Sequence, residues 1–353
     1  MLGFIPVIRI AVLYGGMSTE HSISCISAAS VMANLPPETY EVVPVGITRD
    51  GVWVEGEHDP VRGEALPVVQ GGREIALSVN PLRKGQLFDV ATGEQLAQVD
   101  VVFPVLHGKY GEDGTVQGLL ELAGVPYVGP GVLASACGMD KEYTKKLVSA
   151  AGIAITREVV LRAGEELTEE QREYLSLPVF VKPANGGSSI GVSKVTRWED
   201  LASAVELARE SDGKVIVEAE LTGAEVEVGV LERPDGTVAA SLPAQLNGTG
   251  ESAEGFYGFE TKYLEDEVTA TIPAPYTEDV LDELRTLAVT AYHAIGCKSL
   301  ARVDFFVTEN GPVLNEINTM PGFTAISMYP QVWAASGVSY PELLDVLVRT
   351  ALR

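Results

Sequence analysis

Three nearly continuous apolar runs near the N-terminus constrain the fold of this chain more than any other feature. They cover residues 9–14, 42–47 and 99–106. Runs of this kind are typical of parallel strands that are covered by helices on both faces. Apolar residues recur at helical spacing over 18–34 and 114–123. We therefore predict an α/β fold with an N-terminal doubly wound parallel-sheet domain over residues 1–130.

The pattern changes after Gly129-Pro130-Gly131. Two further α+β subdomains are predicted, over 131–218 and 219–353. The elements expected in them are helices at 133–151, 199–209, 278–295 and 341–352, a strand-loop-strand unit at 179–195 and a strand at 214–218. Residues 49–98, inside the N-terminal domain, are expected to be an insertion of short strands and turns.

The charge of the chain excludes some partners. The 353 residues carry 25 Lys and Arg against 49 Asp and Glu, a net charge of −24. Nucleic acid and anionic membranes are bound by basic surfaces, so neither is expected as a partner. A local cluster of Lys and Arg could still bind a small anion. Three scattered cysteines without a CxxC pair and the absence of an apolar run of ~20 residues predict a cytoplasmic protein.

A glycine-rich loop between two β-branched runs is the first candidate site. It contains Gly186, Gly187, Ser188, Ser189 and Gly191 within the unit 179–195. Glycines allow backbone N–H groups to close around phosphate oxygens, and Lys182 just before the loop would add positive charge. The alternative is a plain hairpin turn.

The second candidate is a hairpin over 301–318 with Asn310-Gly311 at its turn. Because side chains alternate along a strand, Arg302 and Asp304 share one face of the first strand, and Glu316 and Asn318 share one face of the second. Carboxylate and amide oxygens favour Mg²⁺ or Mn²⁺ over zinc. The alternative is the solvated face of an antiparallel sheet.

Three polar loops are further candidates for a functional role. Residues 243–263 lack sustained periodicity, as lids often do, although a disordered surface loop is the alternative. The loops 15–21 and 107–114 each follow an apolar strand and precede a helix. Ligands bind at such strand ends in open α/β sheets, but tight turns and helix caps explain these loops as well.

Taken together, the motifs resemble the D-alanine–D-alanine ligases of the ATP-grasp superfamily. The matching segments lie in the family's order between residues 15 and 327: GGMSTEHSIS, HGKYGEDGTVQG, MDK, VKPANGGSSIGVSKV, FYGFETKY, ARVDFF and NEINTMPGFTAIS. The resemblance implies that 131–218 and 219–353 form a two-part ATP-grasp module with a lid at 243–263, and that ATP lies between the two parts. It further implies ATP-dependent joining of two D-alanines through an acyl phosphate, for peptidoglycan precursor synthesis.

The resemblance also implies roles for individual residues. The ATP-binding set would be Lys141, Lys182, Ser189, Glu218, Ala219, Leu221, Glu225 and Phe306. Asp304, Glu316 and Asn318 would bind two Mg²⁺ or Mn²⁺ ions. Glu20, with Ser188 and Tyr263, would hold the ammonium of the first D-alanine. His107, Lys262 and Ser327 would bind substrate, the last two through the carboxylate of the second D-alanine. Arg302 and the Gly322 N–H would stabilise the oxyanion.

Some positions depart from the family pattern, and alternatives remain open. Gly186 stands where a bulkier residue is common, and Ala219-Glu220 where some members have Lys. Tyr263 fits a D-alanine acceptor, but a ligase that uses D-lactate or D-serine is an alternative. Another ATP-grasp carboxylate-amine ligase is a further alternative, and a catalytically silent nucleotide-binding regulatory protein is one of a different class. The resemblance suggests a homodimer formed through the N-terminal domain.

Overall fold

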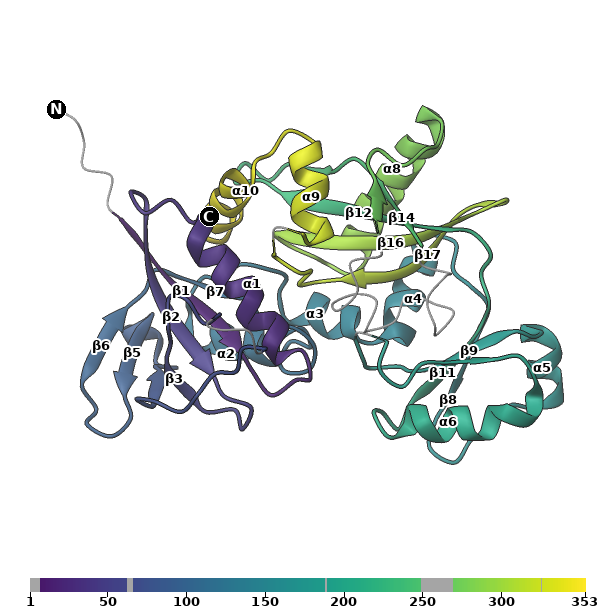
Figure 1. Cartoon of the computed structure of the whole chain (residues 1–353), viewed down its shortest axis with the longest axis horizontal. Coiled ribbons are helices and arrows are strands. Elements are labelled where there is room, and N and C mark those ends of the chain that lie inside the picture. Colours follow the sequence, from purple (N-terminus) through teal and green to yellow (C-terminus); the bar gives the residue numbers. More distant parts are fainter. Residues whose placement is uncertain (1–6, 62–65, 188, 249–268, 325) are drawn as a thin grey trace.

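A computed structural model describes residues 7–61, 66–187, 189–248, 269–324 and 326–353. Figure 1 shows sheet in each of three parts of the chain, with α4 between the C-terminal and the central sheets and α3 on the side of α4 nearer the N-terminal part. In the described residues no helix combines the length and apolar character needed to cross a membrane. Cys25, Cys137 and Cys297 are free thiols.

The N-terminal sheet has the predicted parallel core. Its order is β3-β2-β1-β7, with β2 (Tyr40–Ile47) and β7 (Val101–Pro104) both parallel to β1 (Ile8–Gly15). The edge strand β3 (Trp53–Glu55) runs antiparallel to β2. Alternate residues of β1 point to opposite faces, so one set packs with α1 (His21–Asn34) and the other with α2 (Thr115–Ala123). The doubly wound arrangement is confirmed.

The insertion forms a small sheet of its own. Its elements are β4 (Ile75–Leu77), η1 (Pro81–Arg83), β5 (Gln86–Asp89) and β6 (Gln95–Gln98). The strands pair antiparallel in the order β4-β5-β6. Ile75 and Leu87 from this sheet join Leu120 of α2 in one apolar cluster, which completes that face of the N-terminal sheet. The prediction of short strands and turns is confirmed.

The central sheet is antiparallel, in the order β10-β9-β11-β8. Its strands are β8 (Glu158–Leu161), β9 (Val179–Pro183), β10 (Ser193–Val195) and β11 (Val215–Ala219). One face is apolar, and residues of α5 (Glu169–Leu175), η2 (Trp198–Asp200) and α6 (Leu201–Arg209) pack against it. The opposite face carries Lys182, Glu218 and Glu158, because they alternate with those apolar residues.

The C-terminal sheet has the path β15-β14-β12-β16-β17, with β13 paired to β12. Its strands are β12 (Ala224–Glu232), β13 (Val238–Ala240), β14 (Ala244–Asn247), β15 (Thr269–Thr271), β16 (Leu300–Thr308) and β17 (Gly311–Asn318). Valines of β12 and β16 pack on α8 (Glu278–Ala294). The same cluster includes Ala134 of α3 (Val132–Met139) and Val148 of α4 (Lys141–Ala150).

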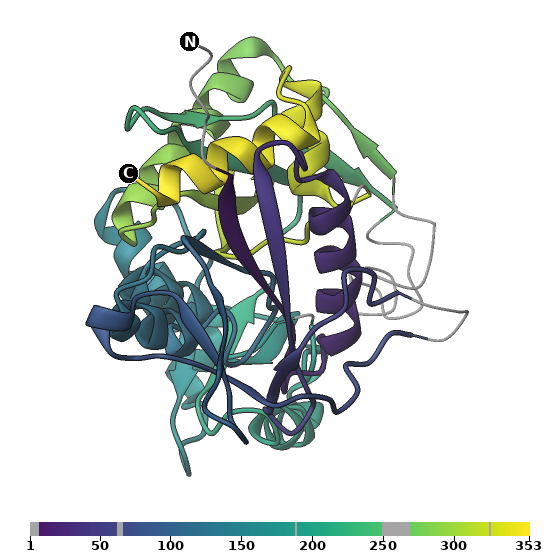
Figure 2. The same ribbon diagram turned by 90° about the vertical axis from the view of Figure 1, so that its left-hand side faces the viewer.

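The two ends of the chain share a core. Residues of α9 (Met328–Ala335) and α10 (Tyr340–Ala351) join the apolar cluster on the α1 face of the N-terminal sheet. Figure 2 shows α10, in yellow, beside the purple α1 and β1. Tyr40 donates to Asp345 Oδ1 at 2.6 Å, and the rings of Phe103 and Phe323 meet edge to face at 5.7 Å. The N-terminal unit is therefore tied to the segment that follows β17.

Candidate active site

The hairpin β16–β17 brings its polar residues together as the sequence predicts. Asp304 pairs with Glu316 and Arg302 with Asn318 across the two strands. A β-bulge follows Asp304, where the register shifts. On the other side of β16, Asp304 pairs with Glu227 of β12. Paired residues point to the same face, so this face of the C-terminal sheet is acidic with one guanidinium among the carboxylates.

Arg302 and Asp304 form a two-pronged ion pair. The Nε and a terminal nitrogen of Arg302 lie 2.8 and 2.7 Å from the two carboxylate oxygens of Asp304, and Nε lies 3.1 Å from Glu227. Burial opposes the charge of Arg302, but Asp304 and Glu227 outweigh it and raise the pKa of Arg302. The guanidinium is therefore a fixed positive charge beside the predicted metal ligands.

The donor set fits a hard divalent cation. Asn318 donates through Nδ2 to Asp304 Oδ2 at 2.8 Å, which leaves its amide oxygen as the remaining acceptor. Glu316 lies opposite Asp304 in the register. Two carboxylates and an amide oxygen are ligands that suit Mg²⁺ or Mn²⁺. Across the described parts of the chain, no group of three or more His, Cys, Asp or Glu side chains is placed to hold a metal ion.

The facing side of the central sheet carries a buried cluster of alternating charge. Lys182 Nζ lies 2.5 Å from Glu218 Oε2, and Lys145 of α4 contacts Glu218 Oε1. Lys145 also lies 3.2 Å from Glu158 Oε2. Burial raises the pKa of Glu218, but the two ammonium groups outweigh this effect and lower it to about 2. Glu218 is therefore ionised at neutral pH.

The residues Lys145 and Glu158 are absent from the sequence predictions. The side chain of Lys145 is 1% exposed, which is exceptional for a lysine and explains why it is paired on two sides. One signal could have found it, because Lys145 follows the predicted phosphate ligand Lys141 by one helical turn and shares its face of α4.

Lys141 connects the two charged faces. It is the first residue of α4, and its Nζ donates to the carbonyl oxygen of Gly186 at 2.6 Å. Its backbone N–H donates to Ala184 O at 3.0 Å. Burial lowers the pKa of Lys141, while Glu316 and Glu218 act in the opposite sense and Lys182 adds to the lowering. One ammonium group thus interacts with the hairpin and with the central sheet.

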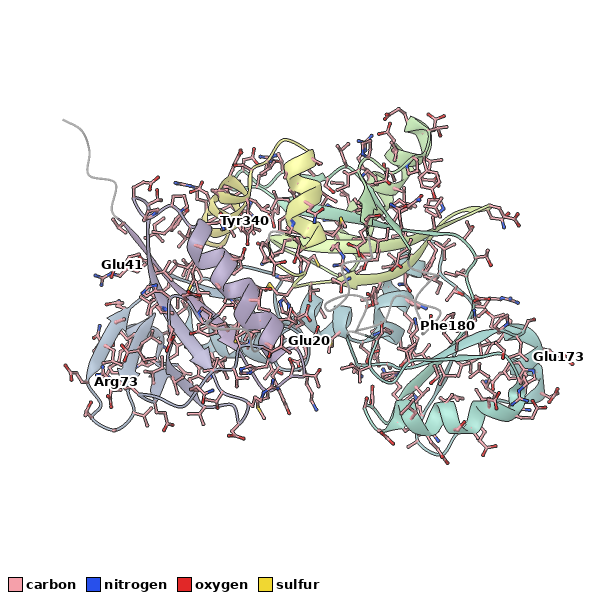
Figure 3. All side chains as sticks on the ribbon, in the orientation of Figure 1. Glu20, Glu41, Arg73, Glu173, Phe180 and Tyr340 are labelled. Carbon is pink, nitrogen blue, oxygen red and sulfur yellow. The ribbon has the colours of Figure 1, made fainter. Side chains whose placement is uncertain are left out.

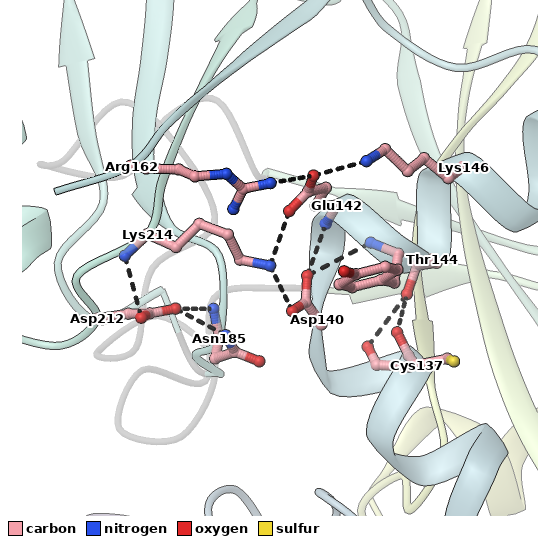
Figure 4. A network of polar contacts seen from close by, with 11 residues as sticks. Cys137, Asp140, Glu142, Thr144, Lys146, Arg162, Asn185, Asp212 and Lys214 are labelled. Atoms are coloured by element: carbon pink, nitrogen blue, oxygen red, sulfur yellow. Dashed lines mark hydrogen bonds and ion pairs between the residues drawn. The ribbon is translucent and has the colours of Figure 1, made fainter. Parts of the chain in front are cut away.

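A polar network fixes the start of the glycine-rich loop (Figure 4). The carboxylate of Asp212 accepts from the backbone N–H and the side-chain amide of Asn185, at 2.9 and 2.7 Å. Lys214 donates to Asp140 Oδ2 at 2.5 Å and to Glu142 Oε2 at 2.9 Å. Asp140 caps the N-terminus of α4. The loop and the helix that carries Lys141 are therefore held together.

Glu20 lies at the N-terminal end of α1 (Figure 3), and its carboxylate approaches Gly108 and Gly187 from two loops. A Cβ atom added to Gly108 would lie 2.6 Å from Glu20 Oε2, and one added to Gly187 would lie 3.4 Å from it. Gly108 also has a φ of +70°. A side chain at position 108 would therefore displace the carboxylate. Glu20, from the N-terminal unit, thus approaches the glycine-rich loop of the central unit.

His107 and Glu112 contact the segment that follows β17. Ring nitrogen Nδ1 of His107 lies 3.2 Å from Met320 O, and Nε2 lies 3.2 Å from Ser27 Oγ. Glu112 accepts from the N–H groups of Gly108 and Met320, at 2.6 and 3.2 Å. Burial and then the charge of Glu20 raise the pKa of Glu112 to about 8. Sequence reasoning assigned no role to Glu112.

Gly322 and Ser327 lie together in the same segment. A Cβ added to Gly322 would lie 2.8 Å from Ser327 Oγ. The hydroxyl of Ser327 accepts from Thr324 N at 3.0 Å and lies 2.8 Å from Thr324 Oγ1. The roles predicted for Gly322 and Ser327 stay predictions, but the two residues are neighbours, as a shared substrate subsite requires.

Of the remaining predicted residues, some lie in the part of the chain that the structure describes and some do not. Glu225 pairs with Phe306 across β12 and β16, on the face that carries Asp304. Ala219 ends β11, and Leu221 follows it. Ser189 has a φ of +56° in the glycine-rich loop. Ser188, Lys262 and Tyr263 lie outside the described residues, as does most of the predicted lid 243–263.

Comparison with known proteins identifies the family. The family model described as D-ala D-ala ligase N-terminus matches residues 9–130, and the one described as D-ala D-ala ligase C-terminus matches residues 146–349. A D-alanine–D-alanine ligase of Corynebacterium efficiens is 61% identical over 349 residues, which cover 98% of this chain and 96% of the relative.

Solved structures agree with the fold. The VanG D-Ala:D-Ser ligase of Enterococcus faecalis has a TM-score of 0.84 and 36% identity, over 98% of this chain and 100% of that one. The D-alanine–D-alanine ligase of Bacillus anthracis, solved with ATP, has a TM-score of 0.74 and 27% identity, over 98% of each chain. With two family models and a relative of this similarity spanning it, the chain belongs to the D-alanine–D-alanine ligase family, whose members have the ATP-grasp fold.

Proposed function

We propose that this protein joins two molecules of D-alanine into D-alanyl-D-alanine, with ATP converted to ADP and phosphate, to supply a peptidoglycan precursor. The observation that carries the proposal is the position of Lys141. Its Nζ donates to the carbonyl oxygen of Gly186 in the glycine-rich loop at 2.6 Å. Burial lowers the pKa of Lys141, whereas the charges of Glu316 on the hairpin and Glu218 on the central sheet act to raise it. Polyphosphate bound between the two faces would meet cations from both, which is what transfer of a phosphoryl group requires.

The nucleotide occupies the space between the two sheets in this proposal. Lys141, Lys182 and Ser189 bind its phosphates. Glu218, Ala219 and Leu221 line the adenine, together with Phe306, and Glu225 binds the ribose. Two Mg²⁺ or Mn²⁺ ions are held by Asp304, Glu316 and Asn318. When bound, such ions neutralise phosphate charge that would otherwise repel an attacking carboxylate.

The first D-alanine is held by its ammonium group. Glu20, with Ser188 and Tyr263, binds that group, and the carboxylate attacks the γ-phosphate of ATP. The amine of the second D-alanine then attacks the acyl phosphate and expels inorganic phosphate. Arg302 and the Gly322 N–H stabilise the oxyanion, while Lys262 and Ser327 hold the second carboxylate. Because an acyl phosphate hydrolyses readily, the proposed lid 243–263 serves to exclude water.

The organisation of the protein is part of the proposal. We divide the chain into an N-terminal domain at 1–130 and two ATP-grasp subdomains at 131–218 and 219–353. A homodimer through the N-terminal domain and a cytoplasmic location complete it. The free thiols of Cys25, Cys137 and Cys297 accord with a reducing compartment.

A second acceptor is favoured by one observation. The VanG structure, titled a D-Ala:D-Ser ligase, covers 98% of this chain at 36% identity. D-serine in place of the second D-alanine is therefore the alternative that competition between the two acceptors tests.

The test of the proposed function is phosphate release from ATP and Mg²⁺ with D-alanine, with L-alanine, or with neither, and mass spectrometry of the product. We expect release only with D-alanine, together with D-alanyl-D-alanine. Release that does not depend on D-alanine would contradict the proposal.

A further inference from the structure

Both backbone polar groups of Met320 are held by one loop of the N-terminal unit. Glu112 Oε1 accepts from Met320 N–H at 3.2 Å, and His107 Nδ1 lies 3.2 Å from Met320 O. A nitrogen that faces a carbonyl oxygen must carry the proton, so His107 donates through Nδ1. Its Nε2 is then an acceptor, and the hydroxyl of Ser27 lies 3.2 Å away. Burial lowers the pKa of His107, which accords with this neutral ring.

Glu112 is anchored at its other oxygen within the same loop. Oε2 accepts from Gly108 N–H at 2.6 Å, so the carboxyl group bridges Gly108 and Met320, which are far apart in sequence. If Glu112 only capped the turn of its own loop, it would not need to accept from a backbone N–H of a distant segment such as that of Met320. Asp113, the next residue, is such a group, because it accepts from the N–H groups of Tyr110 and Thr115.

The segment after Met320 is held from the N-terminal side as well. A Cβ added to Gly129 would lie 2.9 Å from Met320 Cε, so the two residues are in close contact. The ring of Phe323 meets Phe103 of β7 edge to face at 5.7 Å. Gly322 lies between these two anchored residues. Its backbone position is therefore set by the N-terminal unit, although it belongs to the C-terminal part of the chain.

We propose that His107 and Glu112 are positioning residues, which fix the Met320 backbone and thereby place the Gly322 N–H at the oxyanion. The inference rests on the proposed function and deepens it, because it gives His107 a role through Met320 rather than direct contact with substrate. It predicts a defect in one half of the reaction. Activation of the first D-alanine does not use the Gly322 N–H, whereas attack on the acyl carbon does.

The chemistry gives that defect a direct readout. In the productive step the amine nitrogen bonds to the acyl carbon, the carbon–oxygen bond to phosphate breaks, and the nitrogen loses a proton. If that step is slow, water attacks the acyl phosphate instead and returns free D-alanine with phosphate. The ratio of phosphate released to dipeptide formed then rises above one. A fold that is merely weakened would lower both products together.

The first test compares Glu112→Gln with the matched control Asp113→Asn. Both changes replace a side-chain carboxyl group of the same loop that accepts from two backbone N–H groups, but only that of Glu112 reaches Met320. Displacing an oxyanion donor slows the step it serves by up to 10²–10³, so we expect Glu112→Gln to raise the ratio to at least about three. Asp113→Asn is expected to keep it near one. A ratio near one in both variants would overturn the inference.

The second test uses His107 and does not depend on the folding of Glu112→Gln. In His107→Asn the amide nitrogen can take about the place of Nδ1 of the histidine and still donate to Met320 O. In His107→Gln the amide nitrogen takes about the place of Nε2, so the bond to Met320 O is lost. We expect His107→Asn to retain a ratio near one and His107→Gln to raise it. Equal ratios in these two variants would overturn the positioning role. Wild-type phosphate release without D-alanine would instead overturn the proposed function, and this inference with it.

Discussion

Lys182 of β9 lies 2.5 Å from Glu218 of β11, across the two middle strands of the central sheet. Glu218 is buried and the side chain of Lys182 is 13% exposed, and both lie on the face that we assign to ATP. On the opposite side of Glu218 lies Lys145 of α4, which also approaches Glu158. A carboxylate held between two ammonium groups in this way gives the nucleotide face a defined charge before any ligand binds.

The buried lysine predicts a large effect on stability. Lys145→Met leaves Glu218 and Glu158 without one of their charged partners, and breaking a buried ion pair costs about 3–5 kcal/mol. We expect a clear fall in the free energy of unfolding, measured with urea. The control is Lys146→Met on the same helix. Lys146 is 60% exposed, so its pair with Glu142 contributes no more than about 1 kcal/mol. Similar losses in the two variants would contradict the assignment.

The low pKa of Glu218 predicts acid sensitivity. Because the folded pKa of about 2 lies below the ordinary value of 4.5, the ionised carboxylate favours the folded state. This contribution, about 3 kcal/mol, is present above about pH 5 and is lost as the pH falls towards 2. The urea midpoint of Glu218→Gln is therefore expected to fall less between pH 7 and pH 3 than that of the wild type. Glu206→Gln, an exposed change on α6, is expected to follow the wild type. Parallel curves for Glu218→Gln and wild type would refute this account.

The network in Figure 4 predicts an effect on nucleotide binding. Burial disfavours the charge of Lys214, but hydrogen bonds to Asp140 and Glu142 raise its pKa, so it stays protonated. Lys214→Met removes the link between the start of β11 and the N-terminus of α4. We expect a roughly tenfold higher KM for ATP and a smaller change in kcat, because binding geometry rather than a reacting group is lost. Arg197→Met, which removes an exposed pair with Asp200, is the control. An unchanged KM for ATP in Lys214→Met would count against the network's role.

Loss of the hairpin carboxylate is predicted to abolish turnover. Glu316→Ala removes one of the proposed metal ligands, so we expect the rate of phosphate release with D-alanine to fall by at least about a hundredfold. Binding of Mn²⁺ in the presence of ATP, measured by electron paramagnetic resonance, should fall as well. Glu309→Ala, at the exposed turn of the same hairpin, is expected to retain both the phosphate release and the Mn²⁺ binding of the wild type. Near-normal activity of Glu316→Ala would refute the proposed metal site.

The predicted lid residue Tyr263 tests acceptor choice. We expect Tyr263→Phe to raise the use of D-lactate relative to D-alanine, because the hydroxyl belongs to the hydrogen-bonded set proposed around Glu20. The measurement is competition between the two acceptors, with both products quantified by mass. The same acceptor ratio in the variant and the wild type would refute this role.

The parts of the site that lie within one short segment could be predicted from the sequence. The hairpin is an example, since an Asn-Gly turn and a period of two predicted that Arg302 and Asp304 share a face of one strand. The same period put Glu316 and Asn318 on one face of the next strand. The β-bulge after Asp304, which the sequence did not predict, then pairs Asp304 with Glu316 and Arg302 with Asn318. The glycine-rich loop likewise joins β9 to β10, which pair antiparallel. In both cases the chemistry is encoded by neighbouring residues.

Contacts between distant segments could not be predicted in this way. Lys145, Glu158 and Glu218 come from α4, β8 and β11, and no periodicity connects them. The contact of Glu112 with Met320 spans 208 positions and depends on how the N-terminal unit packs on the segment after β17. Helix α5 was not predicted, although its start could have been. Thr168 and Gln171 form a capping box there, and that pattern of residues can be recognised in a sequence.

The central claim is that the first D-alanine is activated as an acyl phosphate. In that route one carboxylate oxygen of the first D-alanine leaves with the phosphate. The most direct test supplies D-alanine with both carboxylate oxygens labelled as ¹⁸O, together with ATP and Mg²⁺, and measures the mass of the phosphate. The account predicts one labelled oxygen in each phosphate and one dipeptide for each phosphate released. Unlabelled phosphate formed alongside dipeptide would contradict it.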